Sequence, residues 1–162
     1  MSSALAFWKT AHILSAAVLF GTGLGIAFFT WFGYRHAMRA GDIGAMRATL
    51  RLTVVADAWL TAPAVVFQAV SGVVLMNLLG WPLLSAWSAA VWSLFVFTGT
   101  CWLPVVWIQI LQWREARDAA SVSALSAAFH TRFRVWFALG VGAFAAVIAI
   151  YWLMVAKPLA IA

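Results

Sequence analysis

The sequence predicts an all-α membrane protein built as a bundle of four transmembrane helices. Of its 162 residues, 66% are hydrophobic and only 9% are charged, which leaves too few polar side chains to cover a water-soluble core. Four apolar stretches are each long enough for a helix to cross a hydrocarbon layer of about 30 Å, which takes about 20 residues. They run from Leu5 to Gly33, from Val54 to Leu79, from Leu84 to Trp113 and from Val135 to Ala156.

The connections between these stretches leave no room for a soluble domain. The two longest, residues 34–53 and 114–134, are too short to enclose a hydrophobic core of their own. The remaining connection, Gly80-Trp81-Pro82, has the composition of a tight turn, so the second and third spans should form an antiparallel hairpin. We therefore expect residues 1–162 to form a single integral membrane domain.

Both long connections contain short amphipathic patterns. Residues 43–52 place apolar side chains on one helical face and arginines on the other, and Val122, Leu125 and Phe129 recur at three- and four-residue spacing. Such patterns are typical of helices that lie in the membrane interface. The predicted fold class is thus a four-helix transmembrane bundle with short interfacial helices in two loops.

Basic residues are distributed asymmetrically, which predicts the orientation in the membrane. Eight of the ten Lys and Arg residues lie in or beside the two long connections. Because cytoplasmic loops are enriched in Lys and Arg, both connections should face the cytoplasm and both termini the outside. The net charge of +6 then reflects topology and contact with the lipid bilayer, and no basic arm indicates nucleic-acid binding.

The residue with the strongest functional implication is His12, an ionisable side chain within the first apolar stretch. Such residues are costly to bury and usually mark a site. Ala16 and Gly23 share its helical face and leave room beside it for a flat ring. A neutral imidazole is a common ligand of heme iron, but the same histidine could equally be a hydrogen-bonded structural residue.

A second axial ligand has several candidates near the outer membrane surface. His36 and His130 belong to the cytoplasmic side, so two histidines cannot meet at this depth within one subunit. Met76 or Met154 could complete a His/Met pair, Lys157 could serve if deprotonated, or the iron could stay five-coordinate. The predicted cofactor-binding set is Lys9, His12, Met76, Met154 and Lys157, with His12 as the metal ligand.

Polar residues also gather around two prolines, Pro63 and Pro104, that interrupt the second and third spans. Asp57 either lines a polar cavity open to the cytoplasm or pairs with Arg51 or Arg134 at the membrane surface. The residues that such a cavity would contain are Asp57, Gln68, Cys101 and Gln109.

Gly21 and Gly25 form a GxxxG pair in the first span. Small residues at this spacing let another helix approach closely, either within the chain or from a second copy or another subunit. The pair is therefore compatible with a homo-oligomer or a larger membrane complex.

Four segments, one from each span, carry a resemblance to a known family. They are Trp8-Lys9-Thr10-Ala11-His12-Ile13-Leu14, Thr61-Ala62-Pro63 through Gln68 to Ser71-Gly72, Cys101-Trp102-Leu103-Pro104-Val105-Val106-Trp107-Ile108-Gln109, and Leu153-Met154 followed by Lys157-Pro158. Together they resemble a bacterial family of predicted four-span membrane proteins of unknown function, over nearly the whole chain.

That family is more remotely similar to a superfamily that contains the copper-resistance D membrane proteins and a heme-containing membrane protoporphyrinogen oxidase. In the oxidase a Trp-x-Lys-x-x-His opening of the first span supplies a heme-ligating histidine, and Lys9 and His12 match the end of that motif. The oxidase-like proteins have a Pro-Arg pair near the end of this span, where the present chain has residues 29–32 of sequence FTWF. Copper transport would need clustered methionine or histidine, and the five methionines are dispersed.

The resemblance thus implies a four-helix scaffold in the bacterial cytoplasmic membrane with a heme b site at His12. The expected function is electron transfer or porphyrin-related oxidation, and whether the protein is an oxidoreductase enzyme stays open. The alternative is a non-catalytic accessory subunit that packs against a larger membrane complex through its GxxxG and tryptophan-rich surface.

Overall fold

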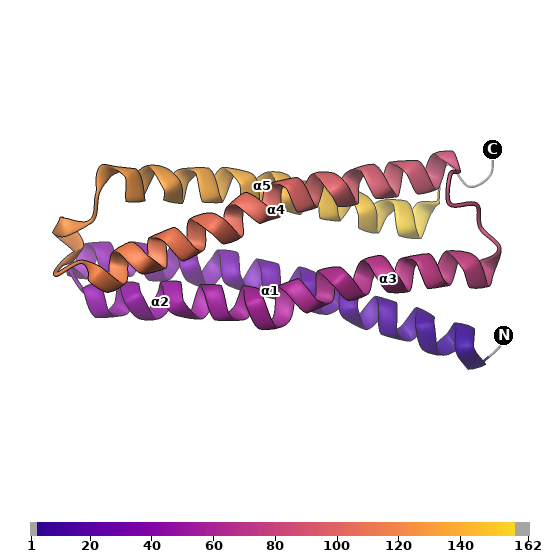
Figure 1. Ribbon diagram of the computed structural model, residues 1–162, viewed down its shortest axis with the longest axis horizontal. Helices are drawn as coiled ribbons and strands as arrows, with labels where there is room; N and C mark the ends of the chain where they lie inside the picture. The colour runs from indigo at the N-terminus through magenta and orange to yellow at the C-terminus, as the bar shows by residue number, and fades with distance from the viewer. Residues whose placement is uncertain (1–2, 158–162) are drawn as a thin grey trace.

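The computed structural model describes residues 3–157, and within this range it contains helices and no strand (Figure 1). The all-α prediction is confirmed, with four helical rods long and apolar enough to cross a membrane. The elements are α1 (Ser3–Ala40), α2 (Ile43–Ala56), η1 (Asp57–Thr61), α3 (Ala62–Leu79), α4 (Ala86–Asp118), η2 (Val122–Ala124) and α5 (Ala127–Ala156).

The second rod is one continuous helix made of α2, the π-helical turn η1 and α3. The π turn lies directly before Pro63, where the missing N–H interrupts the regular hydrogen-bond ladder. Within the π turn, backbone N–H groups bond to the carbonyl five residues back, as the Ala62 N–H does to the Asp57 carbonyl, so the helix continues without a break. Residues 43–52, expected as a separate interfacial helix, are therefore helical but form the first turns of this rod.

The second long connection also lacks a separate interfacial helix. It contains only the three-residue 3-10 turn η2, after which Ser126 caps the start of α5 by accepting a hydrogen bond from the Phe129 N–H at 3.1 Å. Val122 and Phe129, which suggested the amphipathic pattern, are buried in a core cluster with residues of α1, α2 and α4. Their apolar face packs against protein instead of lipid. The three- and four-residue spacing therefore does mark an apolar face, but the prediction that this face lies in the membrane interface is wrong.

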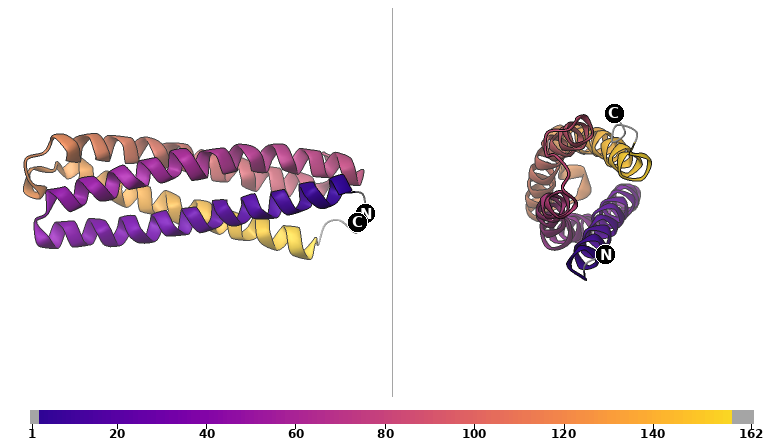
Figure 2. Two further views of the ribbon diagram at one scale, coloured as in Figure 1. Left: turned by 90° about the horizontal axis from the view of Figure 1, so that it is seen from below. Right: turned by 90° about the vertical axis from the view of Figure 1, so that its right-hand side faces the viewer.

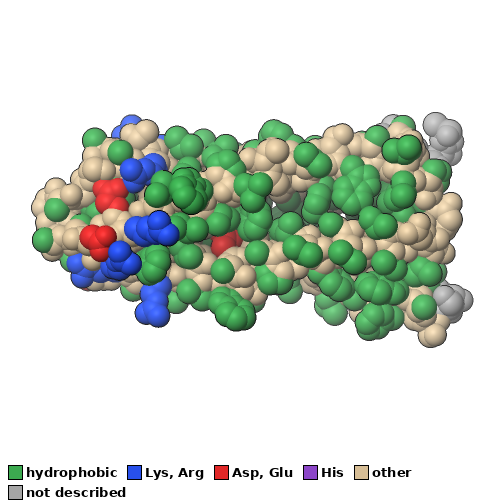
Figure 3. Space-filling view, in the orientation of Figure 1, with side chains coloured by type: hydrophobic (Ala, Val, Ile, Leu, Met, Phe, Trp, Pro, Cys, Tyr) green, Lys and Arg blue, Asp and Glu red, His purple; other side chains and the backbone are tan. Residues whose placement is uncertain are grey.

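The helices extend beyond the predicted spans at the arginine-rich end. The rods contain 30 to 38 residues, so at 1.5 Å per residue they measure roughly 45 to 57 Å. A hydrocarbon layer of about 30 Å covers only part of that length. Figure 3 shows the Lys, Arg, Asp and Glu side chains of this face gathered mainly at one end of the molecule.

The four rods pair as two antiparallel hairpins, α1 with α2–α3 and α4 with α5, whereas the second and third spans, expected to form a hairpin, are joined by a turn but pack little against each other (Figures 1 and 2). The α1–α2 and α4–α5 connections lie at the same end, and α1 begins and α5 ends at the other. At the connection end the hairpins meet through α2 and α4, around the buried side chains of Met46, Leu50, Ala116 and Phe129. Toward the chain ends the hairpins separate, and a cavity lies between them.

One glycine determines how closely α1 and α2 approach. A Cβ atom placed on Gly33 would lie 2.6 Å from the Thr49 Oγ1 atom, a distance that real Cβ atoms do not show. The two helices therefore pack at this point only because residue 33 has no side chain.

Candidate functional site

His12 lies on α1 and is held by α3. The Ser71 hydroxyl donates a hydrogen bond to the Phe67 carbonyl at 2.6 Å, so its oxygen is left to accept one from the His12 Nδ1–H at 2.7 Å. Serine in a helix commonly bonds the carbonyl four residues back in this way. The arrangement assigns the proton to Nδ1 and leaves a lone pair on Nε2.

The surroundings of the His12 Nε2 atom connect it to the cavity. The Gln68 side-chain amide is its hydrogen-bond partner, at 3.5 Å. Gln68 in turn lines the cavity between the hairpins, whereas His12 does not. Gly72 lies beside the ring, where an added Cβ would be 3.7 Å from Cε1. The imidazole is therefore one side chain away from the cavity.

The other predicted cofactor ligands do not gather around this histidine. Lys157 places its Nζ atom 4.7 Å from the centre of the Trp81 ring, a cation–π contact at the α3–α4 turn. Met76 is buried on α3, one helical turn beyond Gly72. Among residues 3–157, no hydrogen bond, ion pair or ring contact joins His12 to any of the four candidates Lys9, Met76, Met154 and Lys157.

The two remaining histidines lie at the arginine-rich end, as predicted. His36 is exposed near the end of α1, and the His130 Nδ1 atom lies 2.7 Å from the Tyr34 hydroxyl. The part of the chain that the structure covers contains no group of three or more His, Cys, Asp or Glu side chains arranged for a metal ion.

The cavity has a volume of about 290 Å³ and is bounded by both hairpins. Ala16, Leu19 and Gly23 of α1 form one wall, and at Gly23 the Phe144 ring fills the space beside the backbone, because an added Cβ would lie 3.2 Å from its Cε2 atom. Leu24 and Val141 lie on its rim and are exposed to the surroundings, so the cavity opens sideways between α1 and α5. At the arginine-rich end the core cluster around Phe129 packs between the hairpins, and the exposed lining residues of the cavity lie on its side instead.

Polar side chains interrupt this otherwise apolar cavity at several levels, since Asp57 and Gln68 lie about 16 Å apart along the second rod at 1.5 Å per residue. Asp57, Gln68 and Gln109 line it, as the sequence suggested. Cys101 does not: it is buried against α5, where a Cβ added to Gly142 would lie 4.0 Å from its Sγ atom. Its role is that of a small buried side chain.

Asp57 has no arginine partner. The ion pairs of the described residues are Arg117–Asp118 and Arg132–Glu115, so the predicted pairing of Asp57 with Arg51 or Arg134 is wrong. Its carboxylate instead accepts a long hydrogen bond of 3.4 Å from the Trp102 indole N–H, and the residue is 5% exposed. It belongs to the π turn that precedes Pro63, and such turns occur frequently at functional sites.

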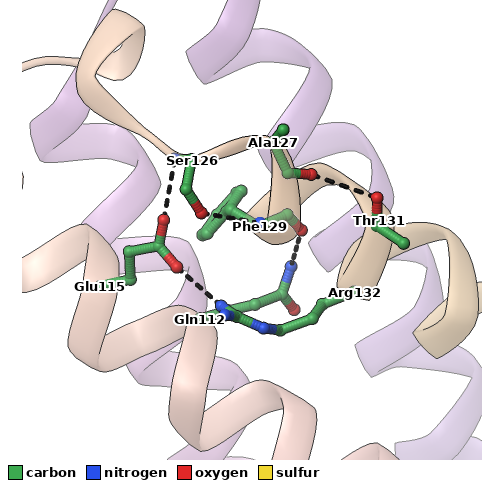
Figure 4. A network of polar contacts seen from close by, with 7 residues as sticks. All are labelled: Gln112, Glu115, Ser126, Ala127, Phe129, Thr131 and Arg132. Carbon is green, nitrogen blue, oxygen red and sulfur yellow. Dashed lines mark hydrogen bonds and ion pairs between the residues drawn. The ribbon is translucent and has the colours of Figure 1, made fainter.

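At the arginine-rich end of the molecule, polar contacts link the end of α4 to the start of α5 (Figure 4). Glu115 accepts a hydrogen bond from the Ser126 backbone N–H at 2.9 Å and pairs with Arg132 at 2.6 Å. Glu115 lies beyond the apolar part of α4. Partial burial raises the pKa of its carboxyl, but the contacts with Ser126 and Arg132 outweigh this effect and lower the pKa below its usual value. These contacts are structural.

Sequence reasoning gave no site role to Ser71, Thr61 and Trp136. Ser71 lies 59 positions from His12, and only the packing of α1 against α3 brings the two together. A small polar residue beside a glycine in an apolar helix was the available signal for Ser71. Trp136 lines the cavity, but nothing in the sequence distinguishes it from tryptophans that face lipid.

The chain was compared with known proteins. A family model described as "Predicted integral membrane protein (DUF2269)" matches residues 6–158, which is nearly the whole chain. No curated protein matches it, and no solved structure does. The match agrees with the four membrane-spanning rods, and the chain belongs to the DUF2269 family of predicted integral membrane proteins.

Proposed function

We propose that this chain is a redox protein of the bacterial cytoplasmic membrane that binds heme b, with His12 as an axial ligand and both termini outside. The remote similarity to the heme-containing oxidase suggests the cofactor. The hydrogen-bonded state of His12 is the observation that carries the proposal.

A histidine that ligates a metal usually donates its other ring N–H to a fixed acceptor. His12 has this arrangement, with Nδ1–H directed to Ser71 and the lone pair of Nε2 directed away from it. The residue next to Nε2 is the neutral Gln68, whose side chain can turn aside without leaving a charge unpaired. The donor set therefore fits a heme with one histidine ligand.

Within such a site this chain's residues would have separate tasks. His12 would hold the iron, Ser71 would orient the imidazole, and the small side chain of Ala16 would leave room for the ring. Met76 is a buried methionine on α3, one helical turn after the Gly72 that lies beside the imidazole. It is the candidate for a second ligand. Bound heme would supply one-electron transfer.

The test is the heme content and absorption spectrum of protein that is produced with ample heme and solubilised gently. Wild type should contain heme with a reducible Soret band. His12→Ala should lose it, while His36→Ala, which removes an exposed histidine from the same helix, should retain it. Ser71→Ala should keep heme but shift the reduction potential, because the imidazole loses its acceptor. Heme-free wild type, or unchanged heme in His12→Ala, would refute the proposal.

A specific observation also favours the alternative role as an accessory subunit. Gly21 and Gly25 are exposed, and a Cβ added to either would meet nothing within 4 Å. The GxxxG face is therefore not used inside the chain and is open to a helix of another subunit. If the purified protein is colourless and co-purifies with other subunits, and Gly21→Leu removes them, this role replaces the heme proposal.

A further inference from the structure

The buried polar atoms that lack a partner all border the same cavity. In residues 3–157, five buried side-chain nitrogen or oxygen atoms have no hydrogen-bond partner. They are Thr61 Oγ1, Gln68 Oε1, Gln109 Nε2, Gln109 Oε1 and Trp136 Nε1, and each belongs to a residue that lines the cavity.

Such a concentration indicates a missing partner inside the cavity. Leaving a buried polar group unpaired costs about 1–3 kcal/mol, and lipid at the flanks cannot satisfy it. Gln109 is 2% exposed, and Thr61 and Trp136 are each 5% exposed, so bulk water does not reach them from outside. The rest of the described chain satisfies its buried side-chain groups, so these residues are arranged for a molecule that enters the cavity.

The donors define the chemistry of that molecule. The Trp136 indole N–H can only donate, and the Gln109 amide and Thr61 hydroxyl can also donate. A matching head group therefore carries hydrogen-bond acceptors for these donors, and it also needs a donor, because the unpaired Gln68 Oε1 and Gln109 Oε1 atoms can only accept. It is not anionic, because the lining contains the carboxylate of Asp57 and no Lys or Arg.

The shape of the cavity points to a flat ring with an apolar tail. Trp102 and Trp136 supply aromatic surfaces among the polar side chains, and a Cβ added to Gly99 or Gly140 of the lining would meet nothing within 4 Å. Apart from the polar side chains, the walls are aliphatic and aromatic. Those side chains are Leu19, Phe95, Phe144, Val147 and Ile150.

We propose that the cavity binds an isoprenoid quinone, whose ring carbonyls accept hydrogen bonds from Gln109 and Trp136 and whose reduced quinol form can donate a hydroxyl hydrogen bond to the Gln109 amide oxygen. The tail lies along the apolar walls and leaves through the sideways opening between Leu24 and Val141, where it meets the lipid in which quinones dissolve. The proposed donors to the quinone do not include His12, so binding does not require heme, and a heme beside Ala16 would occupy part of the same cavity.

The experiment measures binding of radiolabelled decylubiquinone to purified protein in phosphatidylcholine nanodiscs by scintillation proximity. Wild type should bind saturably, with displacement by unlabelled decylubiquinone and not by decylbenzene, which has the tail but no carbonyl. Gln109→Leu and Thr61→Val should each weaken binding, Gln109→Leu by about tenfold, since losing one hydrogen bond in a dry site costs about 1.4 kcal/mol. Thr100→Val, an exposed threonine on α4 outside the cavity, should bind as wild type.

Filling the cavity provides an independent arm with its own control. Gly99→Leu places a side chain into the cavity and should abolish binding, whereas Gly21→Leu adds the same side chain to an exposed position and should not. Gln109→Leu removes two unpaired polar atoms, so its thermal stability without quinone should be no lower than that of wild type. This measurement separates a lost site from a lost fold.

The proposal is overturned if wild type shows no saturable binding. It is also overturned if decylbenzene or diacylglycerol competes as well as decylubiquinone, because the cavity would then be apolar without recognition of the carbonyls. Unchanged binding in both Gln109→Leu and Gly99→Leu would do the same. His12→Ala should still bind decylubiquinone, so failure of the heme proposal and failure of the quinone proposal are distinguishable.

Discussion

Arg47 holds the two hairpins together where the bundle is closed, and its replacement by methionine should destabilise the protein. Its Nε atom donates to the Ala116 carbonyl at 2.9 Å and its NH2 group to the Ala119 carbonyl at 2.7 Å. The carbonyls at a helix C-terminus lack partners within the helix and carry partial negative charge, so a guanidinium there satisfies both needs. Methionine keeps much of the apolar stem and removes the donors.

Hydrogen bonds that involve a charged group contribute about 1.5–3 kcal/mol each. Arg47 is only half-buried, so the lower end of that range applies, and the two bonds share the entropy cost of ordering one side chain. We therefore expect Arg47→Met to lower the free energy of unfolding by about 2–3 kcal/mol.

The assay is unfolding in mixed micelles with increasing sodium dodecyl sulfate, followed by far-UV circular dichroism. Arg51→Met is the matched control, because Arg51 is an exposed arginine one turn further along α2 and forms no hydrogen bond or ion pair within the described chain. If Arg47→Met and Arg51→Met unfold at the same detergent fraction as each other, the capping contacts do not join the hairpins and the reasoning is refuted.

Two further outcomes are expected. The lowered pKa of the Glu115 carboxyl means that its contribution to stability is present above its ordinary pKa of 4.5 and is lost as the pH falls through the lower, folded-state pKa. Glu115→Gln should remove this acid-induced loss of stability. If the variant loses stability at low pH as wild type does, the Glu115 contacts do not cause the loss. Gly33→Ala should lower the unfolding midpoint, because its Cβ would lie 2.6 Å from Thr49 and force α1 away from α2. Gly140→Ala is the control, because it adds a methyl group in open space. Equal midpoints for the two variants would show that α1 and α2 adjust freely.

Much of the fold was predictable because the bilayer constrains the backbone strongly. A chain in lipid must satisfy its hydrogen bonds internally, so length and apolarity are enough to assign helices, and the four rods were located from these alone. The helix ends were not: the segment 43–52 is amphipathic in either setting, and only packing against α4 shows that its apolar face meets protein.

The site was predictable in its residue types but not in its partners. Sequence reasoning singled out His12, Asp57 and Gln109 because polar groups are rare and costly in apolar spans. It could not identify Ser71 as the acceptor for His12, because hydrogen-bond partners on different helices depend on the register of those helices.

The sequence by itself determined that this chain spans the membrane four times, because hydropathy and helix length are local properties that every residue contributes to. The tertiary structure decided that Asp57 lies beside Trp102 without an arginine, and that the unpaired groups of Thr61, Gln109 and Trp136 share one cavity. Both results follow from how far the two hairpins separate beyond their closed end. That separation depends on contacts between residues distant in sequence, such as Arg47 with Ala116 and Gly33 with Thr49, and no local pattern encodes it.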